Sequence, residues 1–148
     1  MKVHPIPADV LARARALAGA DEHHELHPDA PGSPLRCCLR KAAPGEPLVL
    51  FRYSPPSGRG PYEEVGPVFA HAAPCAGPDG ATDLPDDLGR APRTLRAHTA
   101  GGRIHRGETT RPHELADRVA ALLDDPAVAV VQVRSASHGC FLYAVTRD

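Results

Sequence analysis

Tryptophan is absent from the 148-residue chain, and other aromatic residues are few, with three Phe and three Tyr. The core must therefore be built mainly from aliphatic side chains, which the hydrophobic share of 42% supplies. Lysine is also scarce, since Lys2 and Lys41 stand beside 15 arginines. With 18 acidic residues the formal net charge is −1, so the chain lacks the basic surplus that non-specific nucleic-acid binding requires. We therefore expect no nucleic-acid partner.

Long apolar segments are missing as well. The chain contains no run of 18 apolar residues, and its first ten residues, MKVHPIPADV, include no apolar segment of the kind that begins an exported protein. We therefore expect a cytoplasmic protein without a membrane partner. In that reducing compartment the four cysteines are expected to be free thiols rather than disulfides.

The familiar sequence signatures of catalysis and cofactor binding are not found either. The chain has no G-x-S-x-G motif, no phosphate-binding loop and no dinucleotide-binding fingerprint. Gly101-Gly102 fits a hairpin turn and nothing more specific. The sequence therefore indicates no cofactor and no catalytic residue, and it does not decide whether the protein is an enzyme.

The length and the order of the expected elements favour one α+β domain. A chain of 148 residues suits a single domain. Helices are too few and too unevenly placed for repeated βαβ crossovers, so we predict a largely antiparallel sheet of about five to seven strands with two helices. The domain is expected to span 1–148, with a helix at 7–18 and a connector within 1–33, and a sheet core over 34–148 that includes a helix at 112–123.

Three of the four cysteines lie between Pro34 and Cys75. Leu35 to Arg40 alternates apolar and polar residues, which predicts a strand with Cys37 on one face and Cys38 on the other. That placement argues against both thiols binding one metal ion. A turn at 43–46 and an apolar run at 47–53 then predict a hairpin whose second strand is central in the sheet.

Two short segments each supply an imidazole and a thiol: His71 with Cys75, and His138 with Cys140. Together they would satisfy tetrahedral zinc, although their H-x3-C and H-x-C spacings are looser than the C-x-x-C of a structural site. The alternative is a buried Cys140, a capping Cys75 and two surface histidines. The sequence therefore assigns no metal ligand, and a metal- or thiol-dependent enzyme built on these four residues is the second hypothesis for function.

The first hypothesis concerns arginines on or beside the expected strands, where packing alone does not favour them. Arginine binds carboxylate and phosphate groups well, so we predict a polar pocket for a small anionic ligand. Ordinary solvated residues and ion pairs are the alternative interpretation. A protein partner or a second copy of the chain, held at an exposed sheet face or edge, is also considered. The predicted ligand-binding residues are Arg36, Glu64, His71, Arg96, Arg134 and His138.

Several segments in sequence order carry a resemblance to a known family. They are PLRCCLR (34–40), PGEPLVLFRYSP (44–55), GPYEEVGPVFAHAAPC (60–75), LRAH (95–98) and HGCFLYAVTR (138–147). With these segments the chain resembles the domain-of-unknown-function family 1203, a family of small bacterial proteins, from about Gly19 onward. The resemblance implies a bacterial protein and no catalytic residue, because the family carries no established activity.

Overall fold

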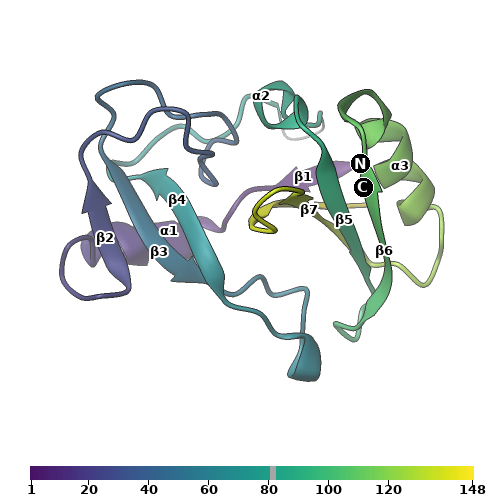
Figure 1. Cartoon of the computed structure of the whole chain (residues 1–148). Helices are drawn as coiled ribbons and strands as arrows, with labels where there is room; N and C mark the ends of the chain where they lie inside the picture. The colour runs from purple at the N-terminus through teal and green to yellow at the C-terminus, as the bar shows by residue number, and fades with distance from the viewer. Residues whose placement is uncertain (81–82) are drawn as a thin grey trace.

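The computed structural model describes residues 1–80 and 83–148. These residues form two antiparallel sheets, each packed against one of the longer helices (Figure 1). The five-stranded sheet has the order β1-β8-β7-β5-β6, from β1 (Lys2–His4), β5 (Arg93–His98), β6 (Ile104–Thr110), β7 (Val130–Ser135) and β8 (Phe141–Thr146). The three-stranded sheet has the order β2-β3-β4, from β2 (His24–His27), β3 (Leu48–Tyr53) and β4 (Gly66–His71).

The helices of the described residues are few, as the sequence predicts. They are α1 (Ala8–Ala16), the single turn α2 (Asp86–Gly89) and α3 (Leu115–Leu123), with short 3-10 turns η1 (Gly60–Tyr62) and η2 (Pro112–Glu114). None of the helices in these residues is long and apolar enough to cross a bilayer. The predicted α+β class with antiparallel strands in one domain is confirmed, and the strands are divided between two sheets.

Helix α3 covers one face of the five-stranded sheet. Its buried residues recur at helical spacing and pack against sheet residues such as Leu95 and Tyr143. Burying each such aliphatic side chain contributes about 1.5–3 kcal/mol. The buried stripe consists of Leu115, Val119, Leu122 and Leu123. The helix predicted at 112–123 is therefore present, with its first turn in the tighter 3-10 form.

Helix α1 covers the three-stranded sheet, burying Leu11 and Ala14 in the second core. Strand β3 is central in this sheet, as its apolar sequence predicts. Strand β2 lies in the segment that was expected to be a connector, and pairs His24 with Phe51. Its sequence, HELH, lacks apolar alternation because it forms the outer strand of the sheet and is half-exposed or exposed along its length.

Residues 35–41 form a turn, so the strand predicted from Leu35 to Arg40 is wrong. The Leu39 N–H donates to the Leu35 carbonyl at 2.9 Å, and Leu39 has φ +59°. Leu35 and Cys37 are buried in the core of the three-stranded sheet, whereas Leu39 is buried in the core of the five-stranded sheet. The alternation of apolar residues therefore reflects two cores on either side of one turn, not two faces of a strand.

The turn of the predicted β5–β6 hairpin holds the segment that leads into β4. Arg59 donates its N–H to the Gly102 carbonyl at 3.0 Å, and Gly102 has φ +79°. A Cβ at Gly102 would lie 2.6 Å from Cγ and 2.9 Å from the backbone N of Arg59. The close approach and the positive φ both require glycine at this position.

We expect Gly102→Ala to lower the free energy of unfolding by about 1–3 kcal/mol, measured by chemical denaturation. Gly101→Ala is the matched control, since its Cβ would meet nothing nearer than Thr99 Oγ1 at 3.7 Å. That variant should change stability by no more than about 0.5 kcal/mol. Equal losses in the two variants would contradict the role assigned to the Gly102 contact.

Candidate functional site

Four side chains that can bind a metal converge beside the end of β4. Cys37 and Cys38 come from the turn at 35–41, His71 is the last residue of β4, and Cys75 follows four residues later. Their ligand atoms all lie within 4.8 Å of one another. Adjacent cysteines converge here because the chain turns, whereas a strand would have separated them.

The turn is brought to β4 by backbone contacts. Leu35 forms a parallel bridge with Phe69, and the Arg36 N–H donates to the Phe69 carbonyl at 2.9 Å. The His71 N–H in turn lies 3.3 Å from Cys37 Sγ and donates to it. A backbone N–H that donates to sulfur favours the thiolate form, which is the form that binds metals.

The spacing of the three innermost ligand atoms matches a tetrahedral zinc site. Zinc bonds of about 2.3 Å to sulfur and 2.0–2.1 Å to nitrogen give tetrahedral edges of about 3.8 Å between two sulfurs and about 3.6 Å between sulfur and nitrogen. The two Sγ atoms of Cys37 and Cys38 are 3.9 Å apart. His71 Nδ1 lies 3.6 Å from the first sulfur and 3.8 Å from the second. Three edges of the tetrahedron are therefore already in place.

The far nitrogen of the His71 ring is also engaged. Its Nε2 lies 3.3 Å from Oε2 of Glu46 and 3.2 Å from Nη2 of Arg40. When Nε2 carries the proton it donates to Glu46, and the Nδ1 lone pair then faces the thiols. When Nδ1 carries the proton, Nε2 can accept from Arg40 instead. A metal ion at Nδ1 would select the first tautomer, which gives the carboxylate–histidine arrangement common at zinc sites.

Hydrogen bonds hold the Glu46 carboxylate where it can accept from Nε2 of His71. Arg40 donates to both of its carboxylate oxygens, at 2.5 and 3.1 Å, and the Ala43 N–H donates to Oε2 at 2.8 Å. These bonds, with Arg40 first, lower the pKa of Glu46 to about 2. The carboxylate is therefore ionised at neutral pH and accepts a hydrogen bond from the imidazole.

The two neighbouring thiols differ in acidity. The hydrogen bond that Cys37 donates to Cys38, followed by burial, raises the pKa of Cys37 to about 12. The same hydrogen bond is the largest cause of the lowered pKa of Cys38. Cys75 is exposed, and Nη2 of Arg15 lies 3.9 Å from its Sγ. The guanidinium groups of Arg15 and Arg40 thus lie beside the cluster.

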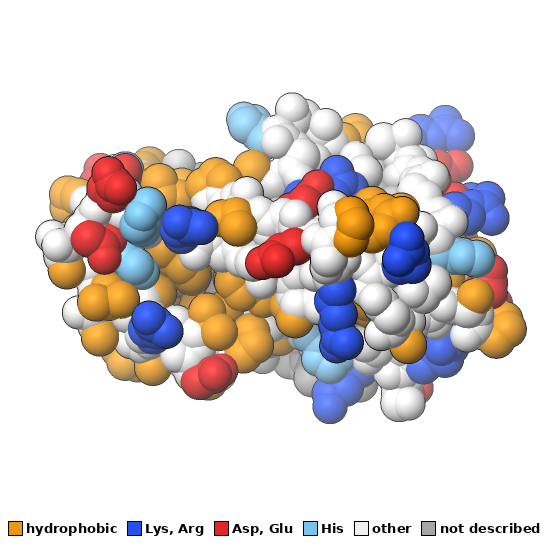
Figure 2. Space-filling view, turned by 90° about the horizontal axis from the view of Figure 1, so that it is seen from below, with side chains coloured by type: hydrophobic (Ala, Val, Ile, Leu, Met, Phe, Trp, Pro, Cys, Tyr) orange, Lys and Arg blue, Asp and Glu red, His pale blue; other side chains and the backbone are white. Residues whose placement is uncertain are grey.

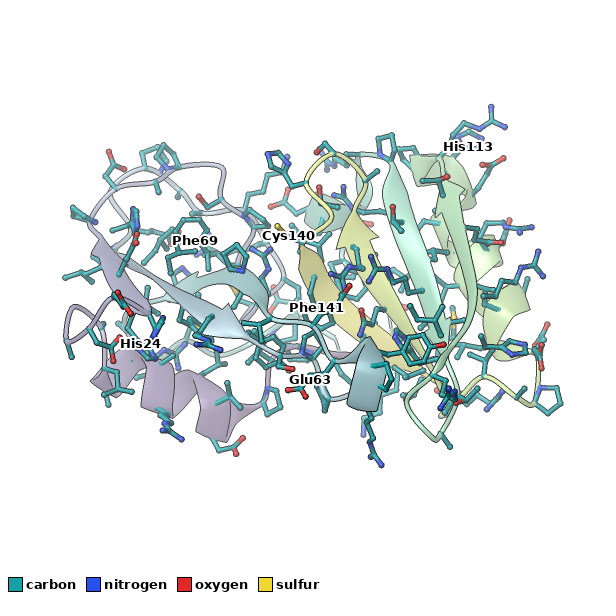
Figure 3. The ribbon with its side chains drawn as sticks, turned by 60° about the horizontal axis from the view of Figure 1, so that its bottom comes forward. His24, Glu63, Phe69, His113, Cys140 and Phe141 are labelled. Carbon is teal, nitrogen blue, oxygen red and sulfur yellow. The ribbon has the colours of Figure 1, made fainter. Side chains whose placement is uncertain are left out.

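A second group of polar residues lies in a cleft of about 390 Å³ between the sheets. Its wall includes Glu64 from the segment before β4, Arg134 from β7, and His138 from the β7–β8 turn. Figure 3 shows Cys140 and Phe141, which also line this cleft, between the two sheets. Arg96 joins the group through an ion pair of 2.6 Å with Glu64.

The six residues predicted to bind a ligand are thus divided. Glu64, Arg96 and Arg134 are joined by ion pairs, and His138 lines the same cleft. His71 lies in the cysteine cluster. Arg36 is buried and donates from Nε to the Phe141 carbonyl at 2.8 Å, so its guanidinium ties the turn at 35–41 to β8.

The four residues considered together as an alternative metal site, His71, Cys75, His138 and Cys140, do not form one group. His71 and Cys75 do meet, but their companions are Cys37 and Cys38. Within residues 1–80 and 83–148, His138 and Cys140 belong to no group of three or more metal-ligating side chains. They lie on the β7–β8 turn, which opens into the cleft instead.

Sequence reasoning missed Cys37 and Cys38 as candidate ligands because it placed them on a strand. A signal was nevertheless present: two adjacent cysteines precede a histidine and a cysteine separated by three residues, in the order C-C…H-x3-C. Only the turn at 35–41 shows that these two pairs meet.

Comparison with known proteins identifies a family but no activity. The model of a family described as "Protein of unknown function (DUF1203)" matches residues 32–147, which confirms the predicted resemblance. No curated protein matches the chain, and no solved structure does. Both the cysteine cluster and the cleft between the sheets lie within the matched residues.

Proposed function

The chain belongs to the DUF1203 family, whose description names no activity, and on the geometry of its site we propose that it binds one zinc ion through Cys37, Cys38, His71 and Cys75. The observation that carries this proposal is the set of three distances, 3.6, 3.8 and 3.9 Å, between the inner ligand atoms. Each agrees with a tetrahedral edge to within about 0.2 Å.

The chemistry of the donor atoms favours zinc over harder ions. Thiolate and imidazole ligands suit zinc, whereas magnesium and calcium take oxygen ligands. Three thiolates and Zn²⁺ together carry a charge of −1, which the nearby guanidinium groups of Arg15 and Arg40 can balance. A neutral Cys37 with its raised pKa is the expected metal-free state, and metal binding would release its proton.

The number of ligands favours a structural centre. Four protein ligands leave no open position for the water or substrate that a catalytic zinc requires. The ion would connect the turn at 35–41, the end of β4 and the segment that follows it. Because this turn contributes to both hydrophobic cores, the metal would stabilise the junction between the two sheets. The exposed Cys75 is the ligand most open to exchange.

Elemental analysis of protein purified without a polyhistidine tag tests the proposal. We expect one zinc per chain, and cobalt substitution should give the visible bands of a tetrahedral thiolate site. Cys38→Ser should weaken zinc binding by at least about 100-fold. Loss of a residue that only hydrogen-bonds to a metal ligand costs up to about 100-fold in metal affinity, and loss of a ligand should cost no less. Cys140→Ser is the matched control, because this cysteine lies outside the cluster, and it should keep full zinc content.

Two results would overturn the proposal. One is a Cys38→Ser variant that keeps stoichiometric zinc. The other is native protein that takes up no zinc or cobalt under reducing conditions.

A further inference from the structure

Arg96 and Arg134 lie side by side on the face of the five-stranded sheet away from α3. In the β5–β7 register Arg96 is opposite Gln132, and Arg134 is two residues further along β7. Residues two apart on a strand share a face, so the two arginines are diagonal neighbours. Burial and the charge of Arg96 both lower the pKa of Arg134, which shows that the pair is electrostatically unfavourable by itself.

One carboxylate bridges the two cations. Oε1 of Glu64 lies 2.6 Å from Nη1 of Arg96, and Oε2 lies 3.0 Å from Nη2 of Arg134. The group therefore carries a net charge of +1. The Glu64 side chain is 44% exposed and comes from the segment between η1 and β4. It can leave the arginines without the loss of any strand pairing.

The buried arginine is fixed in position independently of Glu64. Arg134, only 8% exposed, donates from Nε to the Gly139 carbonyl at 2.8 Å and from Nη1 to Oε1 of Gln132 at 2.6 Å. Gln132 is itself held by Ser57. The remaining Nη2 therefore points to the carboxylate position whether or not Glu64 occupies it. Such a fixed donor binds a ligand without a large ordering cost.

The space beside this position suits a small molecule with an apolar body. The cleft measures about 390 Å³, within the range of small-molecule sites. Tyr53, Val68 and Phe141 line it together with Glu64 and Arg134. On the face seen in Figure 2, Lys and Arg side chains are interspersed with Asp and Glu. An acid with a hydrocarbon or aromatic body therefore fits this cleft better than an inorganic anion does.

We propose that Arg96 and Arg134 bind the carboxylate of a small organic acid, and that Glu64 is an internal carboxylate which this ligand displaces. The body of the ligand then lies against Tyr53 and Phe141. This site is separate from the metal cluster, so the two proposals can fail independently.

Calorimetric titration with sodium benzoate tests the displacement. We expect Glu64→Gln to bind benzoate at least about tenfold more tightly than the native protein. If Glu64 occupies the native site for about nine tenths of the time or more, benzoate finds it open in about a tenth of the molecules or fewer, and its apparent affinity falls by that factor. Glu63→Gln is the matched control: it makes the same change of charge at the neighbouring residue and should leave the affinity unchanged. Adding Arg96→Gln to Glu64→Gln should remove the gain. Thermal unfolding of each variant shows that it is folded.

Several outcomes would overturn the proposal. Equal binding of benzoate by Glu64→Gln and Glu63→Gln would show that Glu64 does not occupy the site. Equal gains for benzoate and the uncharged benzamide would show that the carboxylate is not recognised. A gain for inorganic phosphate without one for benzoate would show that the apolar wall contributes nothing.

Discussion

Removing the proposed zinc ion is expected to lower the midpoint of thermal unfolding by about 10 °C. A ligand that binds only the folded state at 1,000 times its Kd stabilises by about 4 kcal/mol. For a chain of 148 residues each kcal/mol corresponds to about 2–4 °C. The proposed ion would join the end of β4 and the segment after it to the turn at 35–41, which contributes to both hydrophobic cores. Without the ion, the inner sulfurs and the imidazole remain crowded with only hydrogen bonds between them.

Differential scanning calorimetry with and without a chelator measures this shift. Restoring a slight excess of zinc after the chelator should recover the original midpoint. The Cys38→Ser variant is the control, because it should already unfold at the lower temperature and should not respond to the chelator. An equal response of both proteins to the chelator would contradict the assignment of the metal to this cluster.

Replacing Leu39 should be strongly destabilising, and alanine should destabilise more than glycine at this position. Leu39→Ala is expected to cost about 2–5 kcal/mol because the side chain is buried at 3% exposure in the core of the five-stranded sheet. Leu39→Gly removes slightly more side chain, and glycine normally costs about 0.5–1 kcal/mol more than alanine. Here φ is +59°, so glycine relieves backbone strain that alanine keeps. We therefore expect Leu39→Gly to be the more stable of the two variants.

Leu35 provides the comparison within the same turn. It is fully buried, and Leu39 is the only non-glycine residue with positive φ in the part of the chain that the structure describes. Leu35→Gly should therefore be less stable than Leu35→Ala, the usual order. Chemical denaturation of the four variants decides the matter. The same order at both positions would contradict the strained conformation of Leu39.

Much of the fold could be predicted from the sequence because its signals are local. The apolar stripe of α3, the apolar run of β3 and the glycine turn of the β5–β6 hairpin each depend on a few neighbouring residues. Strand β1 has three residues, too few to show a period, and is specified by its pairing with β8. In the turn at 35–41 the alternation of apolar and polar residues predicted a strand that is absent. Leu35 and Leu39 are both buried there, but in different cores.

The sites were harder to predict because they depend on contacts between distant segments. His71 and Cys75 could be singled out by their spacing, but their partners lie more than 30 residues earlier. Arg96 and Arg134 could be placed on strands, whereas the register that makes them neighbours could not be read from either strand alone. Arg36 was predicted to bind a ligand because the sequence does not show that its guanidinium donates to the carbonyl of the distant residue Phe141.

X-ray absorption at the zinc edge tests the proposed site, because it reports the atoms bound to the metal. We expect three sulfurs at about 2.3 Å and one nitrogen at about 2.0–2.1 Å in the native protein. Cys38→Ser should lose the metal and with it the zinc-edge signal. A native shell made only of nitrogen and oxygen would contradict the assignment of the ion to Cys37, Cys38, His71 and Cys75.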